Sequence, residues 1–538
     1  MRCPDVAVGK TSARALRVCV YAIVAALVAT LGLAGGVPSA QAAGYSLTAA
    51  GAGTTTTDKA KTLTVTYKSG SKKVAKATVQ LQYWNGKKWV LEKNVAVKNG
   101  TGSVAVKHTA MNRTYRFYVK GKAASKSFVV RFIPATFTIA GSGSGHGVGM
   151  SQYGAYELSR EGKTAAGILS TYYPGTTTST ANNPSGNIRV QVLGPPADTQ
   201  TTTVLTVDKG GFTLSDQSGN ALFTSTAPGN VAIGVSGASV TAKATPLGGA
   251  TTTLPATSHL IMAWDNTQGT VSVAGAQGTY RFGTLDVSSI QNRPNVVNQL
   301  VLNTEYLEGI DEMAASWGNA GGMAALQAQV IATRTYALRA VVADRAAYPS
   351  TGVKPSCDCN VYDDTRSQNF TGWKKTGLAA NKPWVDAVVA TVHEVPVSAS
   401  FPSGSSVDVL RDASQGFAET PYFASTGKVT NAGTSSNTNV FGTAALPYLK
   451  GVTDPYSAKA PGNPYLSWSK KLTQAQVKKL FGEDVAKLAV SATYPGGLVK
   501  TITVTSSVGK AKTVTKTADA WRSALGVPAP WLTGIVGK

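Results

Sequence analysis

Glycine occupies every second position from Gly141 to Gly149, in the run Gly-Ser-Gly-Ser-Gly-His-Gly-Val-Gly. Because glycine lacks a Cβ atom, such a backbone can adopt positive φ angles and can admit a neighbouring chain or a ligand at close range. A flexible linker is also rich in glycine and serine, but it has no need of the polar and aromatic residues found here, and helix-like sequence follows directly over 153–160. The pattern therefore favours a site over a linker, with His146, Gly147 and Gln152 as candidate binding residues.

The first 42 residues have the pattern of an export signal. Four basic residues lead into an apolar run from Val18 to Leu33, and Ala40-Gln41-Ala42 resembles a small-residue cleavage motif. The apolar run is short and rich in small residues for a membrane span, so an uncleaved anchor is the lesser alternative. We expect a secreted protein that begins near residue 43.

The formal net charge is +24, and removal of the signal leaves +21. For an exported cationic protein the natural anionic partners are cell-wall polymers and membrane surfaces. Nucleic acid is disfavoured by the compartment and by the absence of a concentrated basic motif. Solubility alone is the other explanation of the charge.

Apolar and polar residues alternate through residues 43–135, as in Leu63–Tyr67 and Val79–Trp84, and turn signals separate these runs. Several short strands over about ninety residues predict an all-β, immunoglobulin-like sandwich, although it lacks the cysteine pair of that fold. Tyr83, Trp84 and Trp89 offer a sugar-binding platform, but packing across neighbouring strands is the more common use of such residues.

Residues 136–538 mix helical and strand patterns, so the fold class of the chain is α+β. The glycine run and two helices, over 153–161 and 164–173, make up residues 136–176. Strand-like runs fill 187–302, an acid-rich segment and a long helix fill 303–350, and 351–538 completes this second domain.

The long helix is predicted over Met323–Tyr348, where it ends before Pro349. Gln327 and Arg334 lie one heptad apart on its otherwise apolar face. A buried arginine needs a partner, because an unpaired charge costs several kcal/mol to desolvate. We expect that partner to be a nearby carboxylate.

Four acids fall within residues 303–317, although acids are scarce in this chain. If the segment is helical, Glu308 and Glu312 share one face. The apolar neighbours of Glu312 would raise its pKa toward the value that a general acid needs at neutral pH. The alternative is a plain helix with solvated acids and a structural pair between a glutamate and Arg334.

Only Cys357 and Cys359 remain once the signal is removed. A bond between cysteines separated by one residue would be strained, so the pair is predicted to be two thiols or half of a metal site. They are the weak candidates for a zinc site, and no other cofactor is expected.

Several segments, in order, resemble the SpoIID/LytB family, named for stage II sporulation protein D and amidase enhancers. The resemblance covers roughly residues 137–533, and it rests on Tyr306–Met313, Ala325–Gln329, Ala332–Leu338, Tyr422–Gly427, Leu446–Leu449, Val452–Tyr456 and Trp521–Gly526.

This resemblance implies a lytic transglycosylase that cuts peptidoglycan glycan strands between N-acetylmuramic acid and N-acetylglucosamine. Glu312 stands where the family has its catalytic acid. It would protonate the glycosidic oxygen and then accept a proton from the muramyl C6 hydroxyl, which leaves a 1,6-anhydro end. Because the substrate supplies its own nucleophile, one essential carboxyl group is sufficient.

The chain also departs from the family pattern. The block around His146 precedes the other blocks, so the domain is predicted to be circularly permuted, with His146 still close to Glu312. Ala314 stands where proline is common, and the cysteine segment is contracted and lacks histidine. Ala424 replaces a polar residue beside Ser425 and Thr426.

Ser425, Thr426, Gln152 and Arg334 are candidates to line the cleft, although each could instead be an internal hydrogen-bonding residue. Beyond a transglycosylase, two other functions are open. One is a wall-binding protein that enhances or scaffolds an amidase without cutting glycan. The other is a purely structural adhesive protein, which would leave the glycine-histidine run unexplained.

Overall fold

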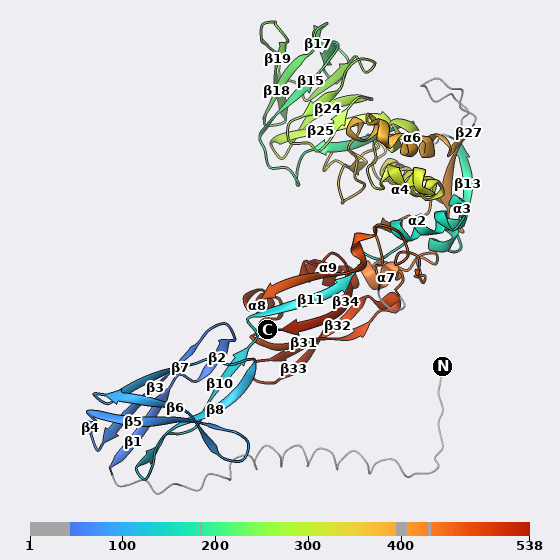
Figure 1. Ribbon diagram of the computed structural model, residues 1–538. Coiled ribbons are helices and arrows are strands. Elements are labelled where there is room, and N and C mark those ends of the chain that lie inside the picture. Colours follow the sequence, from blue (N-terminus) through green and yellow to red (C-terminus); the bar gives the residue numbers. More distant parts are fainter. Residues whose placement is uncertain (1–43, 183–185, 394–405, 429–431) are drawn as a thin grey trace, which may run out of the picture.

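The computed structural model describes residues 44–182, 186–393, 406–428 and 432–538, so the predicted export signal lies outside the described residues. The molecule is elongated, with the N-terminal β-domain at one end and the C-terminus near the middle (Figure 1). None of the helices in these ranges combines the length and apolar character needed to cross a membrane. The structure is mixed α+β, as predicted.

The N-terminal domain is all-β, as its alternating sequence predicts. Its strands join in one sheet with the order β1-β3-β7-β6-β5-β8-β10-β2, and β4 and β9 add to β3 and β8. Inward-facing residues such as Leu63, Val65 and Phe117 are fully buried in its core. The immunoglobulin-like topology stays a prediction. The strands are β1 (Tyr45–Ala50), β2 (Gly53–Thr56), β3 (Lys61–Ser69), β4 (Lys72–Lys73), β5 (Lys76–Trp84), β6 (Trp89–Lys98), β7 (Thr101–Val106), β8 (Met111–Val119), β9 (Ala123–Ala124) and β10 (Phe128–Ile133).

The aromatic residues at the β5–β6 turn pack across strands. Trp84 and Trp89 are directly paired in the strand register, and their ring centroids lie 5.5 Å apart. The guanidinium of Arg116 lies 4.4 Å from the Trp89 ring centroid. These contacts favour the cross-strand interpretation over a free sugar platform.

The next strand, β11 (Thr136–Ser142), leads directly into a second body built mostly from the C-terminal residues. It lies between β30 (Trp468–Thr473) and β34 (Trp531–Gly537). Phe137, Ile139 and Trp521 are buried in a separate core there. The remaining elements are β31 (Val485–Thr493), β32 (Val499–Ser506), β33 (Ala511–Thr515), α8 (Gln474–Phe481) and α9 (Ala518–Leu525).

Two larger sheets form the opposite end of the molecule (Figure 1). One has the order β17-β16-β21-β24-β25-β14-β26, and the other has the order β20-β19-β18-β15-β22-β23. The strand-like runs predicted over 187–302 lie in these two sheets. The first sheet contains β14 (Asn187–Leu193), β16 (Phe212–Ser215), β17 (Ala221–Ser225), β21 (His259–Trp264), β24 (Thr284–Ile290), β25 (Arg293–Val301) and β26 (Val361–Tyr362), and the second contains β15 (Thr202–Val207), β18 (Gly229–Ser236), β19 (Ser239–Pro246), β20 (Thr252–Thr253), β22 (Val271–Val273) and β23 (Thr279–Tyr280).

The helices predicted from sequence are present. They are α2 (Gln152–Arg160), α3 (Ala165–Tyr172) and α4 (Met323–Ala347). The long helix α4 is buried on most sides, because α2, α3, α6 (Lys382–Val389) and β28 (Ser406–Arg411) all pack against it. The remaining short elements are α5 (Trp373–Thr376), α7 (Asn437–Phe441), β12 (Met150–Ser151), β13 (Thr177–Asn182), β27 (Val392–His393) and β29 (Tyr422–Phe423).

The acid-rich segment is not one helix, so the prediction that Glu308 and Glu312 share a helical face is wrong. A π-helical turn over Leu302–Tyr306 ends just before Gly309, and a 3-10 helix begins only at Ala315. A Cβ atom on Gly309 would lie 2.6 Å from the Phe370 ring, so the chain there is pressed against residues 370–372. That long-range contact, and not helical propensity, shapes the backbone around Glu312.

Candidate functional site

The glycine-histidine run packs against residues 421–425, a segment almost 280 positions later in the chain. At Gly145 φ is +104°, and a Cβ atom would lie 2.6 Å from that of Phe423. At Gly149 φ is +72°, and a Cβ atom would lie 2.0 Å from the Pro421 carbonyl oxygen. The glycines therefore admit a neighbouring chain, and no side chain of normal size fits between the two segments.

Backbone hydrogen bonds join the two segments. Strand β12 pairs in parallel with β29, and Ser144 forms an antiparallel bridge with Ser425. The Tyr173 hydroxyl donates to the Pro421 carbonyl at 2.7 Å. The run is thus a fixed part of the fold, which excludes the linker interpretation.

His146 is held in one orientation within this interface. Its Nδ1 accepts the Val148 amide hydrogen at 3.1 Å, which leaves the proton of the neutral ring on Nε2. The rings of Phe423 and Phe441 lie 5.6 and 5.1 Å from the imidazole centroid. Burial lowers the pKa of His146 to about 4, although a hydrogen bond to the Tyr422 backbone opposes this shift. The imidazole is therefore neutral near pH 7.

Glu312 lies in the loop before the 3-10 helix, where residues 369–370 position it. The Asn369 amide donates to Glu312 Oε1 at 2.7 Å, and the Asp311 amide donates to the Asn369 carbonyl at 2.8 Å. Lys375 Nζ holds the neighbouring Asp311 carboxylate at 2.6 Å and the Met313 carbonyl at 3.0 Å. These bonds direct the two adjacent acids to different surroundings, so that Asp311 is neutralised and Glu312 is not.

Burial raises the pKa of Glu312 above its ordinary value. Hydrogen bonds from the Asn369 amide and from the Tyr422 side chain act in the opposite direction, and the nearby Asp311 charge adds to the rise. The sequence-based expectation of a raised pKa is met in direction. Its main cause is desolvation, which penalises the charged carboxylate.

A chain of buried amides and hydroxyls supports this carboxyl group. Gln368 accepts a hydrogen bond from the Tyr306 hydroxyl at 2.7 Å and donates to the Tyr422 hydroxyl at 3.1 Å. On the other side, Gln152 Nε2 donates to the Glu312 backbone carbonyl at 3.1 Å. Gln152 therefore positions the backbone of Glu312 from helix α2.

Glu312 and His146 line one cavity of about 480 Å³. Arg366 and Arg522 line it as well, and each is paired with an acid close in sequence, at 2.9 Å from Asp364 and 2.6 Å from Asp519 respectively. Charged and aromatic side chains both line the cavity. The full lining is Gly145, His146, Glu312, Tyr336, Thr365, Arg366, Ser367, Thr420, Pro421, Tyr422, Phe423, Phe441, Asp519 and Arg522.

The stretch that carries Glu312 and Asn369 matches a known family. Residues 291–397 match the sequence model of SpoIID, described as stage II sporulation protein. This part of the chain belongs to the SpoIID family.

Two relatives from Bacillus subtilis (strain 168) match short stretches. The chain is 56% identical to an amidase enhancer over 41 residues, which are 8% of this chain and 6% of the relative. It is 53% identical to a stage II sporulation protein D over 47 residues, which are 9% of this chain and 14% of the relative. The matches therefore cover a small part of either SpoIID-family relative.

Among solved structures, the E. coli alpha-2-macroglobulin in its native conformation shares 7% sequence identity with this chain. The alignment covers 48% of this chain and 22% of that one, with a TM-score of 0.15. A score this low gives no information about the fold of this chain.

The cavity that holds Glu312 is not lined by four of the predicted binding residues, Gly147, Gln152, Ser425 and Thr426. Ser425 and Thr426 are fully buried, where Ser425 Oγ accepts from Asn463 at 2.9 Å and Thr426 donates to Asp454 at 2.9 Å. A Cβ atom on Gly147 would lie 2.9 Å from Leu498, so this residue is a packing position. For Ser425 and Thr426 the internal hydrogen-bonding alternative fits the structure better.

Arg334 is also outside the cavity, and its expected carboxylate partner is not found among the described residues. Its guanidinium is fully buried and donates to the Asp408 backbone carbonyl at 3.0 Å and to Thr391 Oγ1 at 2.9 Å. Burial lowers the pKa of Arg334 to about 9, and the Asp408 charge opposes this shift. Arg334 thus ties helix α4 to β28 through the Asp408 carbonyl, and to the residue just before β27 through the Thr391 hydroxyl.

The two cysteines form a disulfide bond, so the prediction of two thiols or half of a zinc site is wrong. The intervening Asp358 adopts a positive φ of 50°, and the Cys357 and Cys359 Cα atoms lie 5.1 Å apart. Sequence separation alone could not show this left-handed turn. Bonded cysteines cannot serve as thiolate ligands.

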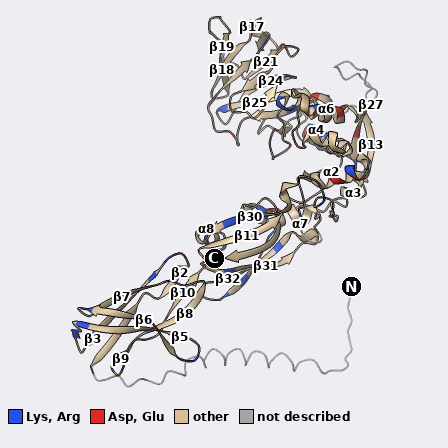
Figure 2. Ribbon diagram, in the orientation of Figure 1, with Lys and Arg blue, Asp and Glu red and all other residues tan. Residues whose placement is uncertain are grey.

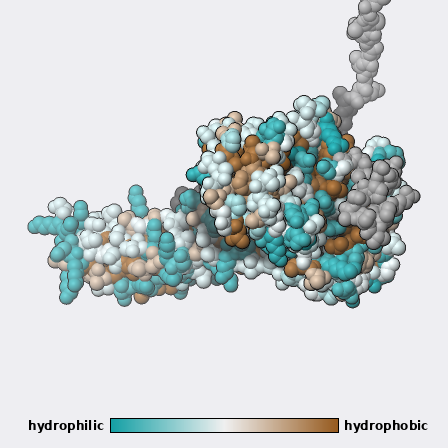
Figure 3. All heavy atoms as spheres, turned by 90° about the horizontal axis from the view of Figure 1, so that it is seen from above, coloured by the Kyte–Doolittle hydropathy of each residue, from teal (hydrophilic) through white to brown (hydrophobic). Residues whose placement is uncertain are grey.

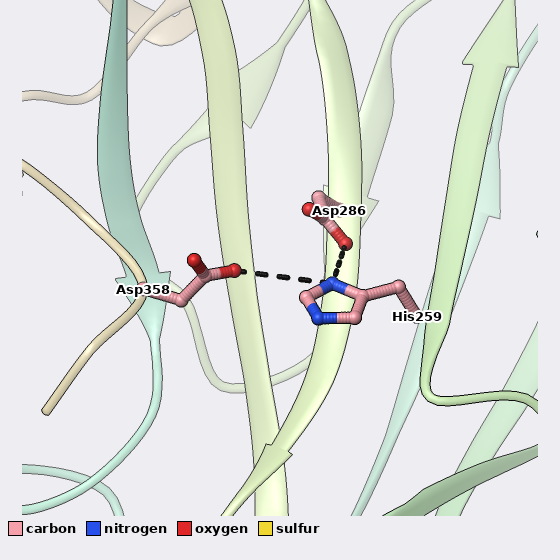
Figure 4. Close-up of side chains that lie close together, drawn as sticks. All are labelled: His259, Asp286 and Asp358. Atoms are coloured by element: carbon pink, nitrogen blue, oxygen red, sulfur yellow. Dashed lines mark hydrogen bonds and ion pairs between the residues drawn. The ribbon is translucent and has the colours of Figure 1, made fainter. Parts of the chain in front are cut away.

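One other group could hold a metal by its donor types, and it is drawn in Figure 4. His259 Nδ1 lies 2.9 Å from an Asp286 carboxylate oxygen and 3.9 Å from one of Asp358. Arg189, however, already lies 2.9 Å from Asp286 and 2.6 Å from Asp358. The guanidinium neutralises both carboxylates, so we interpret the cluster as an ion-pair network that anchors the disulfide turn to β14 and β24.

Sequence reasoning did not select several residues that the fold brings to the cavity. Tyr422 and Arg522 lie within the segments that carried the resemblance, which was the available signal. Arg366, Asn369 and Phe441 lie in loops or short helices without a motif, and only the folded chain brings them near Glu312.

Proposed function

We propose that this protein is an exported lytic transglycosylase of the cell wall that cuts peptidoglycan glycan strands, with Glu312 as its acid and base. The observation that carries the proposal is the position of Glu312 in the cavity, with a raised pKa and no cationic partner among the described residues. A carboxyl group whose pKa is raised keeps its proton to a higher pH than an exposed one, and can release it to a leaving oxygen.

The number of unpaired carboxyl groups that line the cavity supports this reaction type. Asp519 also lines the cavity, but its carboxylate is paired with Arg522 at 2.6 Å. A hydrolase of the two-carboxylate type needs a second available carboxylate as base or nucleophile. A reaction in which the substrate supplies its own nucleophile needs only one, and that matches the single unpaired acid among the described lining residues.

In the proposed reaction, Glu312 donates its proton to the oxygen that links N-acetylmuramic acid to N-acetylglucosamine. The bond from the muramyl anomeric carbon to this oxygen breaks, and the C6 hydroxyl of the same sugar attacks the anomeric carbon. The Glu312 carboxylate accepts the C6 hydroxyl proton and is thereby restored. No water is consumed, and the products are a 1,6-anhydromuramyl end and a free N-acetylglucosamine end.

Tyr422 and Asn369 would act as positioning residues in this scheme. Their hydrogen bonds to the Glu312 carboxylate fix its orientation and favour its ionised form. They therefore oppose the rise in the pKa of Glu312 that burial causes. His146 lines the cavity as a neutral imidazole and would contact the sugar through its ring or its neighbouring backbone.

The second candidate is a wall-binding amidase enhancer that does not cut glycan. The observation in its favour is that one of the matched relatives carries the name amidase enhancer. Ala314 also favours the enhancer function. It follows the Glu312-Met313 pair at a position where proline is common in the SpoIID/LytB family. In this case the partners would be peptidoglycan, anionic wall polymers and an amidase.

One experiment separates the two. Purified mature protein is incubated with intact and peptide-stripped peptidoglycan, and the products are analysed by mass spectrometry for 1,6-anhydromuramyl ends. A transglycosylase releases them, and the Glu312→Gln variant does not. Wall binding without these products, together with stimulation of an added amidase, would replace the proposal with the enhancer function.

A further inference from the structure

The positive charge of the chain is concentrated in the N-terminal domain. Residues 44–135 contain 17 lysines and arginines and only two acids, a formal charge of +15, which leaves +6 for residues 136–538. Glu92 is paired with His108 and Arg113, and the pKa of Asp58 is lowered mainly by a hydrogen bond from Thr56, with smaller contributions from Lys59 and Lys107. Most of the domain's lysines therefore have no acid near them to neutralise their charge.

Seven exposed lysines lie at one end of this domain, and we call them the lysine cluster. The strand register sets Lys68 of β3 opposite Lys73 of β4, and Lys76 of β5 opposite Lys98 of β6. The turn between β8 and β9 reaches the same end, because Lys122 lies 5.0 Å from the Tyr45 ring and Tyr45 pairs with Ser69. The cluster is Lys68, Lys72, Lys73, Lys76, Lys98, Lys120 and Lys122.

The turn Asn99-Gly100 joins the parts of the cluster. The Gly100 amide donates to the Val74 carbonyl at 2.8 Å, and a Cβ atom on Gly100 would lie 2.6 Å from that of Lys73. Within the described residues, no carboxylate forms an ion pair with any of the seven lysines.

Direct pairing of lysine with lysine lowers the stability of a sheet. Solubility does not require it, because dispersed charges serve that purpose equally well. A surface that keeps two such pairs, with further lysines around them, is suited to a ligand that carries several negative charges close together. Binding of that ligand would relieve the repulsion, and this gives the cluster a use that solubility does not supply.

The lysine cluster lies at the free end of the molecule. Strand β10 leaves the domain at Ile133, at the end where it pairs with β2, while β4 and the start of β1 lie at the opposite end (Figure 1). Basic residues mark this outer end in Figure 2, and hydrophilic side chains cover it in Figure 3. It is therefore open to a large partner while the cavity of Glu312 stays unobstructed.

The surroundings of the cluster argue against insertion into a membrane, which would need an apolar face beside the charges. The exposed large apolar side chains of this domain are Trp84, Leu91 and Met111. Trp84 ends the strand that Lys76 begins, and Met111 begins the strand that leads to Lys120, so both lie at the opposite end. The cluster itself offers charge and little apolar surface.

We propose that the lysine cluster is a binding site for a linear wall polymer with repeating phosphodiester groups. The choice of a wall polymer over other polyanions rests on the export that the proposed function includes, but the binding itself does not depend on Glu312. Phosphates spaced along a flexible chain can each meet a lysine and release their counterions, so the binding is electrostatic and salt-dependent.

The test uses the full mature chain and soluble poly(glycerol phosphate) as the probe, with a neutral polysaccharide and anionic lipid vesicles as parallel ligands. The first variant carries Lys72→Gln, Lys73→Gln, Lys76→Gln and Lys98→Gln. The matched control carries Lys59→Gln, Lys87→Gln, Lys88→Gln and Lys107→Gln, which removes the same charge from exposed lysines outside the cluster.

The proposal predicts that the cluster variant loses at least about tenfold in affinity for poly(glycerol phosphate), with a shallower salt dependence, while the control changes by about twofold or less. The cluster variant should also unfold at an equal or higher temperature, since repulsion is removed, which separates a binding defect from misfolding. Equal losses in both variants would overturn the proposal, and so would binding to vesicles without binding to the polymer. A Glu312→Gln protein that binds normally but releases no anhydro ends keeps this inference separate from the proposed activity.

Discussion

The backbone amide of Asn369 donates a 2.7 Å hydrogen bond to Oε1 of Glu312, while Lys375 holds the neighbouring Asp311. Residues 369–375 thus place the two adjacent acids in different environments. Asp311 becomes the exposed partner of the buried Lys375 in an ion pair, and Glu312 becomes a desolvated carboxyl group in a cavity.

The Tyr422 hydroxyl lowers the pKa of Glu312 by hydrogen bonding to the ionised carboxylate. Tyr422→Phe removes that bond, so the pKa of Glu312 should rise further. Because the proposed reaction starts from protonated Glu312, the alkaline limb of the pH profile of kcat/KM should move to higher pH. The profile for release of anhydro ends measures this, and an alkaline limb that moves to lower pH would contradict the assigned role of Tyr422.

Gly145 and Gly175 both have positive φ, but only Gly145 is closely packed: a Cβ atom there would meet Phe423, and one on Gly175 would meet nothing within 4 Å. Gly175→Ala should cost about 1 kcal/mol of unfolding free energy from the backbone conformation alone. Gly145→Ala should cost about 1–3 kcal/mol more, because the two segments must separate. Denaturant unfolding of both variants measures the difference, and equal losses would show that the contact with Phe423 is not tight.

His146 should make the protein less stable in mild acid. Its pKa in the folded state is about 4, below the ordinary value of 6.5, so the unfolded chain binds the proton more readily. Its contribution to stability is therefore complete above about pH 6.5 and is lost as the pH falls toward 4. The fall in unfolding free energy between neutral pH and pH 4.5 should be smaller in His146→Phe than in the native protein. An unchanged fall would mean that the pKa of His146 is the same in the folded and the unfolded protein, which contradicts its burial.

The mature chain should contain no free thiol and no bound zinc, because its two cysteines are bonded to each other. Thiol titration of the denatured, unreduced protein should give no thiol per chain, and it should give two after reduction. Two thiols before reduction, or zinc at one ion per chain by elemental analysis, would restore the metal-site interpretation.

Local patterns in the sequence predicted the secondary structure where it depends on neighbouring residues in the chain. The alternation in 43–135 predicted an all-β domain, and the spacing in Met323–Tyr348 predicted α4, because burial of one face follows directly from periodicity. The glycine run predicted a close approach. It did not show that residues 421–425 are the approaching chain.

Contacts between residues far apart in the sequence determine the features that the sequence did not predict. Gly309 packs against Phe370 and so breaks the helix expected around Glu312, and the left-handed Asp358 lets two cysteines bond that spacing seemed to keep apart. Arg334 donates hydrogen bonds to a carbonyl and a hydroxyl group, although a carboxylate partner was expected. None of these partners is close in sequence, so no local pattern could identify them.

The most direct test of the account compares Glu312→Gln with Glu308→Gln. Burial also raises the pKa of Glu308, to about 7, but its side chain does not line the cavity. On peptide-stripped peptidoglycan, Glu312→Gln should lose at least about a hundredfold in the rate of 1,6-anhydromuramyl release, while Glu308→Gln keeps a rate close to that of the native protein. A Glu312→Gln protein that releases anhydro ends at the native rate would contradict the central claim.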